Sequence, residues 1–180
     1  MSLECFLAWT ELLENIEKTN PEKKNDPPPS GPFFDDFKVG MKFKSKIGRT
    51  ITDVDNIWFT LLTNNNNQIH FNKDYVEKFY SEKPFEGKLV VNGFLTLAIA
   101  AGLLIEYTSS MGFMLGIDNV KFVHPVFPGD TLYSEAEVIE VRESKSMPQY
   151  GIIKIRTEGY NQKGEKVIEF DRAFMVPKKT

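Results

Sequence analysis

The 180-residue sequence has one cysteine, two histidines and no long apolar run. Because Cys5 stands alone, an intrachain disulfide and a zinc site built from several cysteines are excluded. No apolar stretch reaches the length of about 18 residues that a membrane helix needs, and no secretory leader pattern opens the chain. These features predict a cytoplasmic protein with no membrane partner.

Positive charge is also scarce, with 22 lysines and arginines against 25 acidic residues and a net charge of -3. Nucleic-acid binding usually requires a basic face, so we expect no nucleic-acid partner. Hydrophobic residues make up 41% of the sequence, and fifteen of them are phenylalanines. This composition predicts a folded domain with an aromatic core.

The N-terminal part differs from the rest of the chain. Residues 3–18 have the apolar spacing of one helical face, and a linker with three consecutive prolines follows. We therefore expect residues 1–30 to form a helical extension with a Pro-rich linker and residues 31–180 to form one core domain. The extension would pack on its own domain or on a sister subunit.

The core domain shows strand, helix and turn patterns in a defined order. Residues 131–141 alternate between apolar and polar, which is typical of an antiparallel sheet with one wet face. The apolar segment 89–107 predicts a long helix, buried on most sides, that covers the other face. The fold class is thus α+β, a curved antiparallel sheet wrapped around one long central helix. The expected strands are 41–53, 118–122, 131–143, 151–160 and 166–176; shorter helices are expected at 54–63 and 73–80, and turns at 128–130 and 161–164.

Any acid-base chemistry is expected to start at His70, which follows a run of four asparagines. An imidazole is the side chain that can both accept and donate a proton near neutrality. His124 precedes a proline and is interpreted as a strand-end residue. No pair of histidines has metal-ligand spacing, and amides are poor zinc ligands, so no metal site is predicted.

The segment around His70 resembles the hydratase motif of the MaoC-like branch of the hot-dog superfamily, which includes the (R)-specific enoyl-CoA hydratases. Four positions depart from that motif: Asn64 replaces a glycine, Asn65 an aspartate, Gln68 a proline and Asn72 a trailing aspartate. The matching positions are Phe59, Leu62, Thr63, Asn67, Ile69 and His70. The resemblance covers residues 33–178 and includes segments 34–40, 93–95 and 125–131. Segments 48–52 and 137–146 are similar to a subgroup related to mesaconyl-CoA, methylmalyl-CoA and itaconyl-CoA hydratases.

This resemblance implies a hot-dog fold and an acyl-CoA hydratase or dehydratase, a carbon-oxygen lyase acting across the 2,3-bond of an enoyl-CoA thioester. It implies that His70 moves the protons, that Asn65 orients the water and that Asn67 holds the substrate or His70. The N-H groups at Asn92 and Gly93, where the long helix begins, would receive the thioester oxygen. No cofactor is expected beyond coenzyme A in the substrate. A homodimer or a dimer of dimers is expected, with the ligand between subunits.

The amide at position 65 suggests a substrate with a second carboxylate. An aspartate there would repel such a carboxylate by about 1 to 4 kcal/mol at short range, depending on screening. Asn65 removes that repulsion, and Arg49 is a candidate to clamp the carboxylate. The predicted acyl group is therefore branched or dicarboxylic.

Two alternatives remain open from the sequence. A thioesterase would need an acid to activate water, for which Asp74 and Glu86 are the candidates. A catalytically silent acyl-CoA-binding protein would instead explain Asn65 as a sign of lost chemistry.

Overall fold

The computed structural model of the chain describes residues 31–108 and 112–179. The expected helix at 3–18 and its linker lie outside the described residues.

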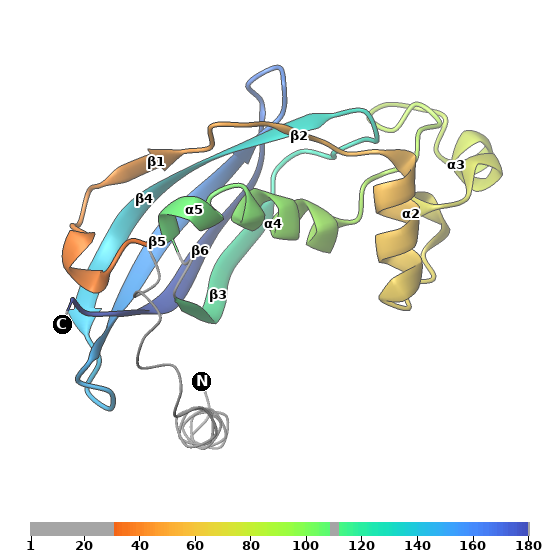
Figure 1. The fold of residues 1–180 in the computed structure, drawn as a ribbon. Helices are drawn as coiled ribbons and strands as arrows, with labels where there is room; N and C mark the ends of the chain where they lie inside the picture. Colours follow the sequence, from red (N-terminus) through yellow and green to blue (C-terminus); the bar gives the residue numbers. More distant parts are fainter. Residues whose placement is uncertain (1–30, 109–111, 180) are drawn as a thin grey trace.

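One curved antiparallel sheet forms most of the described structure (Figure 1). Its strands follow the order β1-β4-β5-β6-β3, and the short β2 pairs with β4 beside this path. The strands are β1 (Lys42–Lys44), β2 (Arg49–Thr50), β3 (Phe113–Phe122), β4 (Thr131–Glu143), β5 (Tyr150–Tyr160) and β6 (Lys166–Pro177). The three longest strands follow one another in the chain and in the sheet, as hairpin connections require.

The predicted alternation in β4 is confirmed. Leu132, Ser134, Ala136 and Val138 are buried, and the residues between them are more exposed. The predicted hairpin after β5 is also confirmed, because Asn161 accepts hydrogen bonds from the backbone N-H groups of Lys163 and Glu165. Side chains at every second position thus meet the helix side of the sheet.

The central helix α4 (Gly93–Gly102) lies against the concave side of the sheet and is followed by the short α5 (Ile105–Thr108) (Figure 1). Helix and sheet approach closely at Gly159, where an added Cβ would lie 2.7 Å from Ile168 and 3.4 Å from Ala100. Buried side chains on both sides of this contact form the core, including Leu95, Leu132, Ile168 and Phe170. The hot-dog arrangement expected from the sequence is the one observed.

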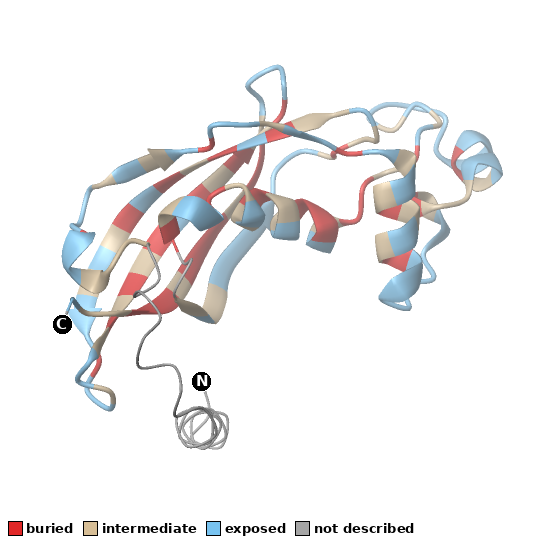
Figure 2. Cartoon of the chain, in the orientation of Figure 1, coloured by how far each residue is buried: buried red, intermediate tan, exposed pale blue. Residues whose placement is uncertain are grey.

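The start of the central helix agrees with the resemblance, which placed it at Asn92 and Gly93, and differs from the apolar pattern, which reaches back to residue 89. Asn92 caps the helix, and the residues before it pair with other loops. The expectation that the helix is buried on most sides was wrong, since Phe94 is 69% exposed and Ile105 is 49% exposed. Buried residues alternate with exposed ones along α4 (Figure 2): Leu95, Thr96 and Ala100 are buried, and Phe94, Ala98 and Gly102 are exposed. In the described chain, an apolar helix face is therefore left uncovered.

Other boundaries also differ from the sequence-based expectations. The expected strand 41–53 is two short strands, and strand 118–122 starts earlier, at Phe113. Helices α2 (Asp53–Leu62) and α3 (Lys73–Phe79) agree with expectation within one residue at each end. Both lie beyond the N-terminal end of α4 (Figure 1). The segment that carries His70 lies between them in the chain.

Candidate active site

Helix α2 has a buried polar edge that faces the start of α4. Thr52 caps α2, accepting a hydrogen bond from the Asp55 N-H while its own N-H donates to the Asp55 carboxylate. One turn later, Asn56 and Thr60 are completely buried. Residues four apart lie on the same helix face, so the two polar side chains project together.

Asn56 ties three segments into one unit. Its side-chain amide donates to the backbone oxygens of His70 at 2.8 Å and Val90 at 3.0 Å. Its side-chain oxygen accepts the Asn92 N-H at 2.8 Å. Thr60 accepts a further bond from the Asn92 side chain at 3.3 Å. A buried amide whose donors and acceptor are engaged fixes its neighbours firmly.

His70 ends a single 3-10 turn, η3 (Gln68–His70), and only 9% of its surface is exposed. Its Nδ1 lies 2.8 Å from the Val90 carbonyl oxygen. Because a carbonyl can only accept, Nδ1 must carry the proton in this contact. The neutral ring then has Nε2 as a proton acceptor, which is the state required of a general base.

The N-terminus of α4 is linked to His70 through Val90, whose carbonyl accepts the bond from Nδ1. Asn92, two residues beyond Val90, caps α4 by accepting the Phe94 N-H at 3.0 Å. Within the described residues, the Gly93 N-H donates to no acceptor. A Cβ at Gly93 would lie 3.0 Å from the Phe122 ring. Glycine here keeps the helix end close to that ring and leaves one N-H for a ligand oxygen.

Local structure accounts for much of the asparagine run. Asn64 has a positive φ of 55°, a conformation that asparagine adopts more readily than most residues. The Asn65 side-chain oxygen accepts the Asn67 N-H at 3.0 Å, and the Asn67 side chain in turn caps η3. Asn72 caps α3. Asn65 is linked to His70 through Asn67, whose carbonyl accepts the His70 N-H at 3.3 Å.

Arg49 is engaged elsewhere. Its guanidinium forms an ion pair with Asp55 at 2.8 Å and donates to the Thr50 carbonyl. It also lines a groove beside Ile99 and Gly102, toward the C-terminal end of α4. The structure therefore does not bring the expected clamp into the hydrogen-bond network around His70.

The residues considered for the alternatives are on the surface. Glu86 is exposed and pairs with Lys88 at 3.0 Å, and hydrogen bonding by that lysine lowers the pKa of the Glu86 carboxyl. Asp74 is exposed in the first turn of α3. His124 is exposed just after β3, as expected for a strand-end residue. In the described part of the chain, none of the three forms a hydrogen bond with His70.

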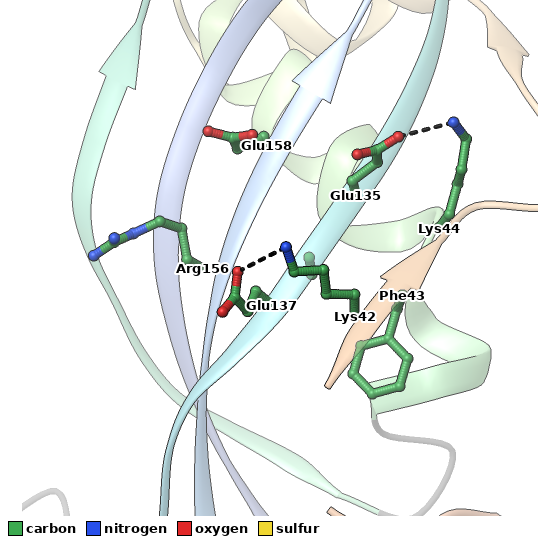
Figure 3. Close-up of a pocket in the computed structure, with 8 residues that line it drawn as sticks. Lys42, Phe43, Lys44, Glu135, Glu137, Arg156 and Glu158 are labelled. Atoms are coloured by element: carbon green, nitrogen blue, oxygen red, sulfur yellow. Dashed lines mark ion pairs between the residues drawn. The ribbon is translucent and has the colours of Figure 1, made fainter. Parts of the chain in front are cut away.

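A separate hollow of about 390 Å³ lies on the sheet near β1 and β4. Figure 3 shows that charged side chains from neighbouring strands dominate it, including Arg156 and Glu158. Its lysines and glutamates pair across the strands, Lys42 with Glu137 at 3.5 Å and Lys44 with Glu135 at 2.8 Å. Such pairs are typical of a solvated sheet surface.

Sequence reasoning missed Asn56, the residue that organises the site. Its signal was weak: Asn56 and Thr60 are four residues apart in the expected helix and so lie on one face of it. Among residues 31–108 and 112–179, no group of three or more metal-ligating side chains is placed to hold a metal ion. The described helices also include none with the length and apolar character needed to cross a membrane.

Comparisons with known proteins identify the family to which the sequence is similar. The family model described as "Mesaconyl-CoA hydratase" matches residues 16–180. A mesaconyl-CoA hydratase from Haloarcula marismortui is 30% identical over 151 residues, which are 83% of this chain but 41% of that protein. The chain thus spans less than half the length of this curated relative.

Solved structures show the same fold. The monoamine oxidase regulatory protein from Archaeoglobus fulgidus aligns with a TM-score of 0.70 at 29% identity, covering 83% of this chain and 97% of that one. A Mycobacterium tuberculosis protein described as having a double hotdog fold aligns at 22% identity with a TM-score of 0.73. That alignment covers 83% of this chain and 45% of the longer one.

Proposed function

The chain belongs to the mesaconyl-CoA hydratase family, and on this premise we propose that it is an enoyl-CoA hydratase or dehydratase in which His70 transfers the proton. The observation that supports this most is the contact between His70 Nδ1 and the Val90 carbonyl, two residues before the capped start of α4. This contact and the hydrogen bonds of Asn56 hold the His70 ring and the N-terminus of α4 in one network. Those are the two elements that hydration of an enoyl thioester requires.

The proposed reaction uses the two nitrogens of His70 differently. Nε2 removes a proton from water as the oxygen adds to C3 of the enoyl group. The Val90 carbonyl, bonded to Nδ1, favours the imidazolium that forms. The Gly93 N-H receives the negative charge on the thioester oxygen, and the imidazolium then returns its proton to C2. Dehydration follows the same steps in reverse.

Asn65 is proposed to orient the attacking water and to avoid charge repulsion with a carboxylate on the acyl group. Its side-chain oxygen is already bonded to the Asn67 N-H, so its amide nitrogen is the group left to contact water. An amide at this position repels no second carboxylate, which is why we propose a branched or dicarboxylic acyl group. Asn67 would act indirectly, by holding both Asn65 and η3 in place.

Hydration can be tested with mesaconyl-, itaconyl- and crotonyl-CoA, comparing the native protein with Asn65→Asp. We expect the native protein to favour a dicarboxylic substrate and the variant to shift toward crotonyl-CoA. If crotonyl-CoA is already the best substrate and the variant gains nothing on it, the charge argument fails. Release of free coenzyme A would indicate a thioesterase, and binding without turnover a silent acyl-CoA-binding protein.

We also propose that two copies of the chain associate. Strand β3 is an edge of the sheet, and Met114 and Phe122 on it are more than half exposed. An uncovered sheet edge with exposed apolar side chains favours association. Sedimentation should show a dimer or a dimer of dimers, and a monomer at micromolar concentration would contradict the proposal.

A further inference from the structure

A groove with a cavity volume of about 500 Å³ runs beside the exposed face of α4. Its walls are apolar: Phe94, Leu97, Ala98 and Ala101 from the helix, and Met114 and Ile117 from β3. It extends from the second residue of α4 to Ile105 in α5. One end therefore adjoins the proposed thioester position at Gly93, and the other lies at the C-terminal end of the helix.

Arg172 of β6 lines this groove and is buried, with 5% of its surface exposed. One terminal nitrogen donates to the Thr108 hydroxyl at 2.8 Å, and the other approaches the Ala101 carbonyl at 3.5 Å. Its Nε has no hydrogen-bond acceptor within the described residues. The guanidinium also lies 5.6 Å from the centre of the Phe174 ring.

No acidic side chain in the described part of the chain forms an ion pair with Arg172. Arg156 on the neighbouring strand is the contrast, because it is more exposed and pairs with Asp171 at 3.1 Å. Burial lowers the pKa of the Arg172 guanidinium to about 10. A buried cation is normally compensated by an anion with matching hydrogen-bond geometry. Within the described structure, Arg172 has none.

We propose that this groove holds the acyl chain of the substrate and that Arg172 receives a carboxylate at the far end of that chain. The inference rests on the proposed hydratase function for its chemistry, and it concerns a carboxylate at the far end of the acyl chain, distinct from a carboxylate near Asn65. From Gly93 to Ala101 the helix rises about 12 Å, at about 1.5 Å per residue. The carboxylate of a mesaconyl group would stop short of Arg172, whereas a medium-chain ω-carboxyacyl group would reach it.

The activity test uses a matched substrate pair, dec-2-enedioyl-CoA and dec-2-enoyl-CoA, which differ only in the carboxylate at the far end. For the native protein we expect kcat/KM to favour the first by about 10- to 100-fold, the factor that a hydrogen bond to a charged group contributes. Arg172→Met should abolish this preference by lowering kcat/KM for dec-2-enedioyl-CoA more than for dec-2-enoyl-CoA. Arg172→Lys should restore part of the preference, and the matched control Arg156→Met should leave it unchanged.

A binding measurement separates this inference from the proposed function. Calorimetry with octanoate and with 1-octanol requires no turnover and probes the groove in the intact protein. We expect octanoate to bind the native protein at least about 10-fold more tightly than Arg172→Met, and octanol to bind both equally. A second copy of the chain that filled the groove would prevent both ligands from binding, and that result would overturn the inference.

The two measurements distinguish a failure of this inference from a failure of the proposed hydratase function. If no enoyl-CoA is hydrated but octanoate binding depends on Arg172, the hydratase proposal fails and the carboxylate site stands. If both decenoyl substrates are hydrated equally well by the native protein, the carboxylate site is wrong and the hydratase stands. If Arg172→Met lowers kcat/KM equally for both substrates, the arginine has a structural role only.

Discussion

The two ends of α4 differ in how their polar groups are satisfied. At the N-terminal end, Asn56, Asn92 and His70 bond to one another's backbone or to Val90, and Asn56 is fully enclosed. At the C-terminal end, Arg172 is buried with an unpartnered nitrogen beside an apolar groove. A single ten-residue helix thus lies between polar side chains that bond to one another and a buried arginine with an unpartnered nitrogen.

This difference separates two tasks. Proton transfer needs groups held in fixed positions, and a closed hydrogen-bond network supplies them. Selecting a ligand needs a surface that the ligand itself completes, and an apolar groove with one unpaired cation fits that need. We therefore assign chemistry to the first end and substrate choice to the second.

The largest effect on activity should come from removing the His70 imidazole at the N-terminal end of α4. We expect His70→Ala to lower kcat for enoyl-CoA hydration by about 100- to 10,000-fold, because a general acid-base group contributes this much. The fold should survive, since Asn56 still donates to the Val90 carbonyl. Steady-state kinetics with a parallel thermal melt will check this. A variant that retains most of its activity would end the assignment of chemistry to this end.

The next effect tests whether the network itself is rigid. Asn56→Ala leaves the Asn92 N-H without its acceptor and the His70 carbonyl without its donor, both in a buried region. We expect a loss of about 1 to 3 kcal/mol in the free energy of unfolding, the penalty for a buried unsatisfied group. Urea unfolding measures it. Asn66→Ala is the control, because Asn66 is exposed in the adjacent loop and should change stability little.

A smaller effect is expected at the helix start. The methyl group of Gly93→Ala would lie 3.0 Å from the Phe122 ring and beside the free N-H. We expect kcat/KM to fall about 10-fold, the cost of weakening one donor to the developing oxyanion. Adding Phe122→Ala, which removes the ring, should not restore activity. Full restoration would show that Gly93 serves packing alone and that no substrate oxygen approaches it.

The smallest effect concerns Asp171, which precedes Arg172 on β6 but has its charge paired. Burial opposes its ionisation, yet hydrogen bonds from Asn119 and Arg156 outweigh this and hold the pKa of the Asp171 carboxyl below its ordinary value of 3.8. Such a carboxyl stabilises the folded state above pH 3.8 and loses that contribution as the pH falls further. Asp171→Asn should therefore be less stable than the native protein near neutrality, and its stability should depend less on pH below 3.8. Denaturant midpoints across this range will check it, and parallel curves for both proteins would contradict it.

Much of the fold was predictable because its signals are local. Alternation in β4, the Asn161 hairpin and the capped α2 each depend on residues within a few positions of one another. The apolar pattern alone placed the start of α4 too early, because residues 89–91 are apolar enough for a helix but bond to other segments, Val90 to Ile69 and Val91 to Val126. Contacts between distant segments overrode local propensity there.

The candidate site was predictable only in part. His70 was selected from the residues themselves and Gly93 from the resemblance, and their roles stay predictions that activity must test. Asn56 and Arg172 were not found, because their importance comes from burial and from bonds to residues 36 and 64 positions away. Arg49 was selected for its charge, which Asp55 already neutralises. A sequence shows that a charged group is present, but only the structure shows whether it is already paired.

The most direct test of the account incubates the protein with an enoyl-CoA and follows two signals, loss of the conjugated thioester and release of free thiol. We predict that conjugation is lost without thiol release, and that His70→Ala shows neither change. Thiol release would make the protein a thioesterase, and equal loss of conjugation in His70→Ala would remove the histidine from the mechanism. Either result would contradict the assignment of chemistry to the N-terminal end of α4.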